Sequence, residues 1–236
     1  MRQGRYPIPV KDGVVPGSDG AGTVEAVGSR VSRFKTGDKV VTLFNQGHLA
    51  GTLAAGMLAT GLGGSIDGTL REYAAISEQG LVKVPSNLSL VEAATLSCAA
   101  VTAWNALYGL ESRALKPGQT VLTQGTGGVS IFALQFAKAA GARVIATTSS
   151  AEKAEMLKKL GADHVINYKE TPNWGEKAKE LTPDGHGVEH VIEVGGPTTL
   201  AQSLNAIAFD GVICKSYHEF IDTDSRSTII LFLSPF

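Results

Sequence analysis

The glycine-rich segment 125–129 carries the residue types that point most directly to chemistry. It follows an apolar strand pattern and precedes a helical one. Gly125 permits a tight turn, Gly127 leaves room for a pyrophosphate, and a helix that starts near Gly128 directs unpaired backbone N–H groups at the anion. Ser130 stands where the usual fingerprint has its third glycine, and it is small enough to pack the helix on the strand. We predict a phosphate cradle made by Gly125, Thr126, Gly127, Gly128 and Val129.

The elements around this segment alternate between strands and helices. After a helix at 131–140 and a strand at 143–147, Ser149 opens a second helix with Glu152 three residues further on, the pattern of a capping box. Further strands are expected at 164–167, 188–194 and 211–214, and further helices at 174–181 and 198–207. This order predicts an α/β fold with a Rossmann-type doubly wound parallel sheet. The alternative is an α/β domain whose glycines only form a turn; the number of agreeing elements favours dinucleotide binding.

The end of the second strand indicates which dinucleotide binds. A site specific for NAD places Asp or Glu there to accept hydrogen bonds from the ribose 2′-hydroxyl, whereas this chain has Thr148 and Ser149. No acid stands there to repel a 2′-phosphate, and Lys153 adds a cation on the first turn of the next helix. A solvated surface lysine is the alternative interpretation of Lys153; the missing acid favours NADPH.

The first hundred residues follow a different pattern. Short β-prone pieces at 22–27, 40–43, 71–76 and 80–84 alternate with Gly, Pro and Asp, which predicts a mostly-β substrate domain. Ser89 and Glu92 are expected to cap a helix, and a second helix at 101–110 leads into the nucleotide domain. The nearly uncharged segment 47–64 is interpreted either as a lid or partner-facing loop or as a variable insertion.

Composition narrows the class of protein. The 236 residues carry a net charge of −1, 43% of them are hydrophobic, and the two cysteines suggest neither a disulfide framework nor a metal knuckle. The near-zero charge and the lack of a basic run argue against binding to nucleic acid or to an anionic membrane surface. We expect a cytoplasmic protein that acts on a small molecule.

Motifs along residues 5–213 together resemble the medium-chain dehydrogenases/reductases, and within them the zinc-independent quinone-oxidoreductase-like or zinc-type alcohol-dehydrogenase-like branch. They include Pro16-Gly17-Ser18-Asp19-Gly20, Gly37-Asp38-Lys39-Val40, Asp67-Gly68-Thr69, Thr102-Ala103-Trp104, Leu160-Gly161-Ala162-Asp163 and Glu193-Val194-Gly195-Gly196. The resemblance implies a partial, mostly-β GroES-like substrate domain at 1–90 with a bridging segment to about 118, an incomplete Rossmann domain at 119–214, and a tail at 215–236 outside the family pattern.

The same resemblance implies roles for individual residues. Ser149, Lys153 and Tyr168 match the residues that hold the 2′-phosphate in relatives that bind NADPH. The nicotinamide is expected near Thr102, the candidate for the catalytic cleft, and near Gly195 in the loop 194–196.

No metal is expected. Members of the family that use zinc hold the catalytic ion with Cys, His and Cys, and Ser18 stands in place of that His. Cys98 matches the third ligand position, but one thiolate without its imidazole partner does not make a catalytic zinc site. We therefore interpret Cys98 as a small buried residue and His48 as a lone polar residue of a loop.

These features predict an NADPH-dependent oxidoreductase that transfers hydride to a quinone or an α,β-unsaturated carbonyl compound without zinc. A zinc-free alcohol or aldehyde reductase and an inactive NADPH-binding fragment are the alternatives. The family's opening strands would precede Met1 and its sixth sheet strand would follow residue 213, so we expect a chain truncated at both ends and poorly soluble or inactive alone. The apolar run 229–233 is then exposed or forms a makeshift sheet edge, and full-length relatives are expected to be homodimers.

Overall fold

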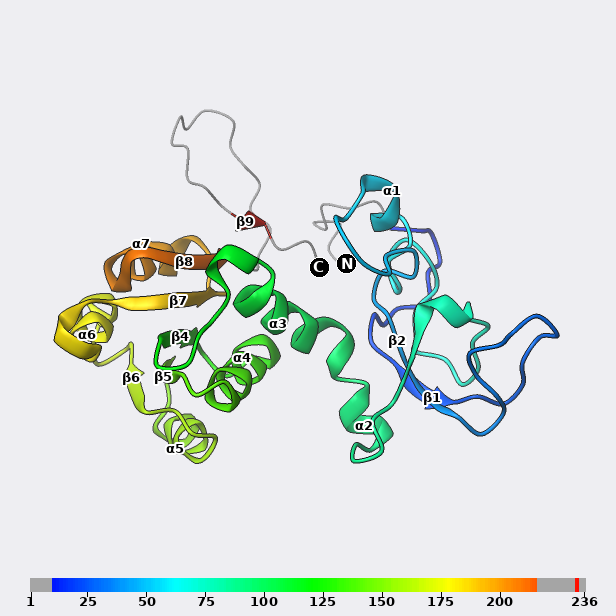
Figure 1. Cartoon of the computed structure of the whole chain (residues 1–236), viewed down its shortest axis with the longest axis horizontal. Coiled ribbons are helices and arrows are strands. Elements are labelled where there is room, and N and C mark those ends of the chain that lie inside the picture. The colour runs from blue at the N-terminus through cyan, green and yellow to red at the C-terminus, as the bar shows by residue number, and fades with distance from the viewer. Residues whose placement is uncertain (1–9, 216–231, 234–236) are drawn as a thin grey trace. The chain divides into compact units, whose positions relative to one another are not determined.

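The structure is a computed structural model that describes residues 10–215 and 232–233. The chain divides into two compact units, with the boundary between Ala99 and Ala100 (Figure 1). Each unit has its own sheet and its own hydrophobic core.

The first unit is built around a small antiparallel sheet. Its strands are β1 (Ala21–Thr23), β2 (Lys39–Thr42) and β3 (Leu81–Lys83), in the order β1-β2-β3. Two short helices, α1 (Ala55–Leu58) and α2 (Leu90–Ala93), belong to the same unit, together with a 3₁₀ turn at Glu78–Gly80. The described segment 71–76 forms no strand, contrary to the prediction. Its Tyr73 is exposed, so the alternating pattern there has no core to face.

The second unit contains a parallel sheet, which confirms the predicted fold class. Its strands are β4 (Thr120–Gln124), β5 (Arg143–Thr148), β6 (His164–Asn167), β7 (Val188–Glu193), β8 (Ile207–Lys215) and β9 (Phe232–Leu233), in the order β6-β5-β4-β7-β8-β9. The chain winds outward from β4 toward β6 and then returns to β7 on the other side of β4. The carboxyl ends of β4 and β7 therefore flank the point where the winding reverses, which is where open α/β sheets bind ligands.

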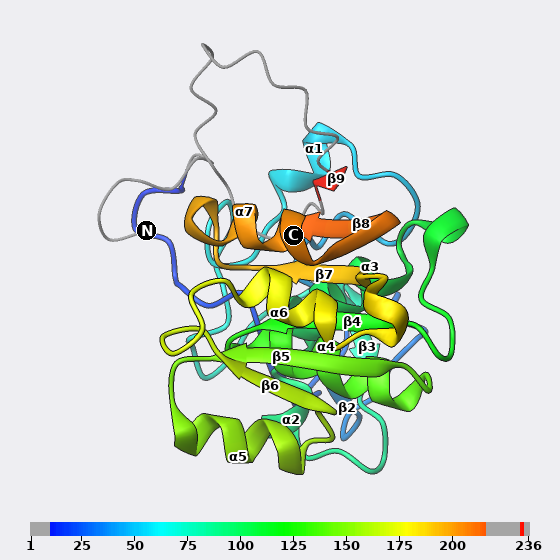
Figure 2. The same cartoon turned by 90° about the vertical axis from the view of Figure 1, so that its left-hand side faces the viewer.

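Helices cover both faces of this sheet. They are α3 (Val101–Tyr108), α4 (Gly128–Ala139), α5 (Ala151–Lys159), α6 (Trp174–Glu180) and α7 (Pro197–Ala206), with shorter turns at Leu96–Ala100, Glu111–Arg113 and Pro183–Gly185. In Figure 2, α6 and α7 lie in front of the strands and α4 lies behind them. Leu122 and Ile145 pack toward Trp174 on one face, whereas Val121 and Val144 pack with α3, α4 and α5 on the other. Alternate residues of each strand thus enter opposite cores.

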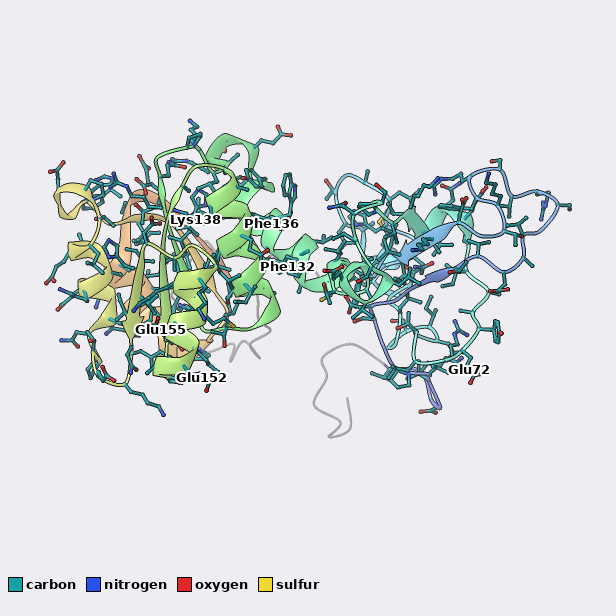
Figure 3. All side chains as sticks on the ribbon, turned by 90° about the horizontal axis from the view of Figure 1, so that it is seen from below. Glu72, Phe132, Phe136, Lys138, Glu152 and Glu155 are labelled. Carbon is teal, nitrogen blue, oxygen red and sulfur yellow. The ribbon has the colours of Figure 1, made fainter. Side chains whose placement is uncertain are left out.

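An aromatic cluster joins α3 to α4. The ring of Trp104 lies 4.4 Å from that of Tyr108 and 5.7 Å from that of Phe136, measured between centroids. Phe132 stacks on Phe136, and Figure 3 labels both on α4. These contacts orient α3, the helix that carries Thr102, on the same side of the sheet as α4.

The structure corrects the predicted start of the helix after β5. Ser150 is the N-cap of α5, and its hydroxyl accepts a hydrogen bond from the Lys153 N–H at 3.5 Å. Ser149 and Glu152 do not form the predicted capping box. The reason is that β5 extends to Thr148, whose carbonyl accepts from the Tyr168 N–H, so the helix begins one residue later.

Other predicted features differ less from the structure. The capping box of Ser89 and Glu92 is confirmed at the start of α2. Segment 47–64, interpreted above as a loop or an insertion, contains the single-turn helix α1. The two residues of β9 pair with β8 at the sheet edge, as one alternative for the run 229–233 predicted; residues 229–231 of that run lie outside the described residues.

Candidate nucleotide-binding site

The turn after β4 requires glycine at its first position. Gly125 has a φ of +71°, and its N–H donates to the Thr147 carbonyl at 2.8 Å. Residues that carry a Cβ rarely adopt this left-handed backbone conformation. Ser130 is buried in the first turn of α4, and its hydroxyl donates to the Gln124 carbonyl at 2.7 Å. A serine in place of the third glycine therefore ties the helix to the end of β4.

The second glycine of the turn is not required by the protein itself. Gly127 has an ordinary φ of −73°, and a Cβ built on it would meet no atom within 4 Å. Within the described residues, the N–H groups of Gly127, Gly128 and Val129 have no hydrogen-bond acceptor. Because α4 is 12 residues long, its aligned peptide dipoles add positive potential at this end. The open space and the vacant donors fit an anionic group such as a pyrophosphate.

The predicted 2′-phosphate residues lie at neighbouring strand ends. Thr148 ends β5 and pairs in register with Asn167 of β6, so Tyr168 follows directly beside it. The Tyr168 N–H donates to the Thr148 carbonyl at 3.0 Å. Ser149 connects β5 to the cap of α5, and Lys153 lies exposed on the first turn of that helix. In the part of the chain that the structure describes, the Lys153 ammonium has no ion-pair or hydrogen-bond partner.

A buried carboxylate lies under the loop after β7, and the sequence reasoning missed it. Glu193 ends β7 and is completely buried. Its Oε1 accepts hydrogen bonds from the Gly195 N–H at 2.9 Å, the Gly196 N–H at 3.0 Å and the Thr199 hydroxyl at 2.6 Å. An acid at the end of an apolar strand pattern was the available signal, since a buried carboxylate needs a dedicated set of donors.

Gln124 connects this carboxylate to the glycine turn. Its amide nitrogen donates to Glu193 Oε2 and to the Ser203 hydroxyl, both at 2.8 Å, and Ser203 also donates to Glu193 Oε2. The amide oxygen of Gln124 accepts from the Val194 N–H at 3.2 Å and the Gly195 N–H at 3.0 Å. One hydrogen-bond network therefore spans the carboxyl ends of β4 and β7.

The predicted cleft residue Thr102 lies on α3, on the face of the sheet that α4 also covers. Thr102 is buried in the first turn of α3. Its neighbour Ala103 belongs to the same hydrophobic cluster as Ile192, against which Val194 packs. Among the described residues, the Thr102 hydroxyl makes no hydrogen bond to the glycine turn or to the loop 194–196. The glycine turn and Gly195 lie at the carboxyl ends of the parallel strands. That Thr102 lies in the catalytic cleft stays a prediction.

Cys98 differs from its prediction because it is only half-buried. Its N–H donates to Asp19 Oδ1 at 2.8 Å, and the Ser18 hydroxyl donates to the same carboxylate. His48 lies in an exposed loop with its Nε2 3.0 Å from the Gly51 carbonyl oxygen. Among the described residues, no three His, Cys, Asp or Glu side chains gather as metal ligands.

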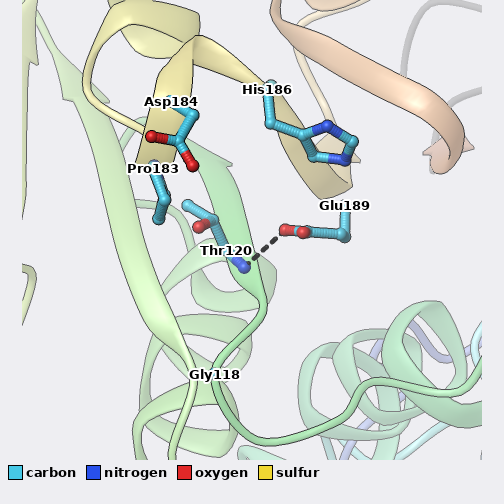
Figure 4. Close-up of a pocket in the computed structure, with 7 residues that line it drawn as sticks. Gly118, Thr120, Pro183, Asp184, His186 and Glu189 are labelled. Atoms are coloured by element: carbon cyan, nitrogen blue, oxygen red, sulfur yellow. Dashed lines mark hydrogen bonds between the residues drawn. The ribbon is translucent and has the colours of Figure 1, made fainter.

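A pocket lies at the opposite end of the parallel strands, where β4 and β7 begin. It has a volume of about 320 Å³ and is lined by residues at the amino ends of β4 and β7, among them Thr120, Asp184, His186 and Glu189 (Figure 4). The Thr120 N–H donates to Glu189 Oε2 at 2.7 Å. None of the predicted cofactor residues lines this pocket.

In the described part of the chain, no helix has the length and apolar character needed to cross a bilayer.

Comparison with known proteins identifies the family. Residues 128–215 match the sequence model of the zinc-binding dehydrogenase family, and residues 1–86 match that of the alcohol dehydrogenase GroES-like domain. A zinc-type alcohol dehydrogenase-like protein of Schizosaccharomyces pombe is 54% identical over 213 residues, which cover 90% of this chain and 61% of the relative. A quinone oxidoreductase of Pseudomonas aeruginosa is 35% identical over 214 residues, covering 90% of this chain and 58% of the relative.

Solved structures agree with this family. A mycobacterial protein in complex with NADPH has a TM-score of 0.71 and 31% identity, with 92% of this chain and 60% of that chain covered. An NAD-dependent alcohol dehydrogenase has a TM-score of 0.76 and 35% identity, with 88% and 61% covered. The chain belongs to the medium-chain dehydrogenase/reductase superfamily, as its motifs predicted, and it spans about three fifths of the length of these relatives.

Proposed function

We propose that the protein is an NADPH-dependent oxidoreductase that reduces a quinone or an α,β-unsaturated carbonyl compound without catalytic zinc. The observation that carries this proposal is the open space in front of Gly127, where the N–H groups of the first turn of α4 point with no acceptor among the described residues. The proposed anion site lies at the carboxyl ends of the strands, where open α/β sheets bind their ligands. When bound, NADPH would supply the hydride.

The preference for NADPH rests on the end of β5. Thr148 and Ser149 stand where an NAD-specific site has an acid, and Lys153 and Tyr168 lie on the two segments that follow β5 and β6. An ammonium without a protein partner is available to a 2′-phosphate at no cost to an existing ion pair. Of the related structures, one is a complex with NADPH and another is named an NAD-dependent alcohol dehydrogenase. The choice of NADPH therefore depends on these residues.

The zinc-free chemistry rests on the residues around Asp19. Ser18 offers a hydroxyl where zinc-binding relatives have an imidazole, and the Cys98 N–H is hydrogen-bonded to the Asp19 carboxylate. Without a Lewis acid, a quinone or a carbonyl compound conjugated with a C=C bond is easier to reduce than a simple ketone. A zinc-free alcohol or aldehyde reductase is the second candidate, favoured by the relatives that are named alcohol dehydrogenases.

Zinc content tests this part of the proposal. The purified chain should carry no stoichiometric zinc after dialysis, because one thiolate lacks the remaining ligands of a catalytic site. Metal analysis by mass spectrometry is the measurement, with Cys98→Ser as the matched variant. A one-to-one zinc content that disappears in Cys98→Ser would show that Cys98 is a ligand.

Partners and location are part of the same proposal. A near-neutral net charge supports a small-molecule substrate rather than nucleic acid or an anionic membrane surface. We further propose that the enzyme is cytoplasmic and that it forms a homodimer, as we expect of its full-length relatives. Cell fractionation and size-exclusion chromatography test these two points.

The function itself is tested by binding and then by turnover. NADPH and NADH are titrated into the 236-residue chain by calorimetry, and NADPH oxidation is followed with a quinone, an enone, a simple aldehyde and a buffer blank. The proposal expects tighter binding of NADPH than of NADH, and turnover on the quinone or the enone. Such turnover would contradict the expectation that the 236-residue chain is inactive alone. Turnover on the aldehyde alone would select the second candidate. Binding with no turnover on any acceptor would select a nucleotide-binding fragment.

A further inference from the structure

We propose that Glu193 is a positioning residue that holds the loop 194–196 for the nicotinamide half of the dinucleotide. The inference rests on the proposed function, because it assigns a role within the same site. The Glu193 side chain lies beneath the loop and is completely buried, whereas Gly195 in the loop is exposed at the carboxyl end of β7. Glu193 therefore acts on a ligand only through the loop.

The two carboxylate oxygens of Glu193 accept hydrogen bonds from different sets of donors. Oε1 receives donors from the loop and from α7, namely the Gly195 and Gly196 N–H groups and the Thr199 hydroxyl. Oε2 receives donors from Gln124 on β4 and Ser203 on α7. Both oxygens thus act as acceptors only, and every donor around them is matched. A buried network in which all groups are satisfied is rigid, since any displacement leaves a polar group without its partner.

The loop has a backbone shape that needs this support. Gly196 has a φ of +89°, and a Cβ on Gly195 would lie 2.4 Å from the Thr199 hydroxyl. Two successive glycines are free to adopt many conformations, so sequence alone leaves the loop undetermined. Two N–H groups aimed at a single carboxylate oxygen select one conformation of the loop.

Gln124 extends the effect to the phosphate cradle. Its side chain binds Glu193 and the loop, while its backbone carbonyl accepts from Ser130 at the start of α4. The spacing between the cradle and the loop is therefore set by groups that are hydrogen-bonded to each other. A dinucleotide that spans both places gains affinity from this spacing, whereas a ligand that occupies only the adenosine side does not.

The test compares a whole dinucleotide with its adenosine half. Dissociation constants are measured for NADPH and for 2′,5′-ADP, which lacks the nicotinamide half, with wild type, Glu193→Gln and a control, Glu189→Gln. A glutamine at 193 has one acceptor oxygen and turns an NH₂ group toward either the loop or Gln124, which breaks the division of donors. Glu189 lies on the same strand at the opposite end, beside the amino-end pocket.

In Glu193→Gln, the NADPH dissociation constant should rise roughly tenfold or more, with the 2′,5′-ADP constant within about twofold of wild type. Glu189→Gln should change neither constant. Equal weakening of both ligands in Glu193→Gln would show a general structural role and overturn the inference, with the proposed function intact. A wild-type chain that binds neither ligand would overturn the proposed function and the inference with it.

A second pair of variants applies if Glu193→Gln does not fold. Thr199→Val removes one donor to Glu193 Oε1 while keeping the shape of the side chain, and Thr199→Ser keeps the hydroxyl. The inference expects weaker NADPH binding in Thr199→Val, wild-type binding in Thr199→Ser, and unchanged 2′,5′-ADP binding in both. Identical NADPH affinities for the two variants would overturn it.

Discussion

At the scale of single residues, the site depends on groups that the protein does not use for its own folding. Gly127 has open space around its Cα, and the Lys153 ammonium has no partner within the described residues. Gly125 is different, because its positive φ is needed by the turn itself. Substitutions at these positions separate ligand binding from stability.

Replacing Lys153 with Ala should weaken NADPH binding and leave NADH binding almost unchanged. Loss of one charge-assisted contact to a 2′-phosphate should raise the NADPH dissociation constant roughly ten- to a hundredfold. Lys159→Ala, at the other end of α5, serves as the control for charge and should change neither constant. Calorimetric titration measures both, and an equal loss for both cofactors would contradict the role of Lys153.

Replacing Gly127 with Ala should abolish tight NADPH binding with little change in stability. The new methyl group meets no protein atom, but it occupies space that the proposed cradle leaves to the pyrophosphate. The free energy of unfolding should fall by less than about 1 kcal/mol, the cost of alanine at an N-cap. Gly125→Ala should cost about 1–2 kcal/mol because of its positive φ. Urea denaturation and NADPH titration of the two variants check this contrast.

At the scale of elements, the end of β5 assigns different tasks to two adjacent serines. Hydrogen bonding between the Tyr168 N–H and the Thr148 carbonyl extends β5 and moves the helix cap to Ser150. Ser149 is left between strand and cap, with its side chain half-buried beside the proposed 2′-phosphate position.

This arrangement predicts opposite outcomes for two alanine variants. Ser150→Ala should lower the free energy of unfolding by about 0.5–1 kcal/mol, since it removes the cap of α5. Ser149→Ala should leave stability unchanged and weaken NADPH binding relative to NADH. Thermal denaturation and cofactor titration distinguish them. A stability loss in Ser149→Ala that equals the loss in Ser150→Ala would contradict this division of roles.

At the scale of the whole molecule, a buried histidine in the middle of the sheet couples folding to pH. His190 on β7 lies between Val121 of β4 and Val212 of β8, and burial lowers its pKa to about 4. Its Nδ1 has no hydrogen-bond partner among the described residues. The folded chain therefore keeps the imidazole neutral, while the unfolded chain protonates it near its ordinary pKa of about 6.5.

Stability should therefore fall as the pH decreases from about 6.5 to about 4. Between these values the unfolded state binds more protons than the folded state, so this group alone removes about 3 kcal/mol of stability by pH 4. Over the same pH range, the free energy of unfolding of His190→Leu should fall by about 3 kcal/mol less than that of wild type. His164→Leu, a substitution of an exposed histidine, should show the same pH dependence as wild type. Urea titrations at several pH values are the measurement. Parallel pH profiles for wild type and His190→Leu would contradict the effect.

Much of the fold followed from local patterns in the sequence. The order of strands and helices after residue 119, the glycine turn and the capping box of Ser89 and Glu92 depend on neighbours in the chain, so they were predictable. Strand alternation at 71–76 gave a wrong prediction, because a strand needs a partner that the local pattern does not specify. The half-exposed position of Cys98 likewise depends on packing.

By itself, the sequence determined the class of the sheet, the family and the positions of the glycine turn and of the acid-free strand end, because these depend on residue types at short spacing. Only the tertiary structure decided which distant groups meet. Glu193 and Gln124 are separated by 69 residues, yet parallel pairing of β4 and β7 places their side chains in one hydrogen-bond network. Parallel pairing of β5 with β6 places Tyr168 beside Thr148, and pairing of β7 with β4 and β8 buries His190. Such contacts arise from strand order and register, which a linear pattern does not encode.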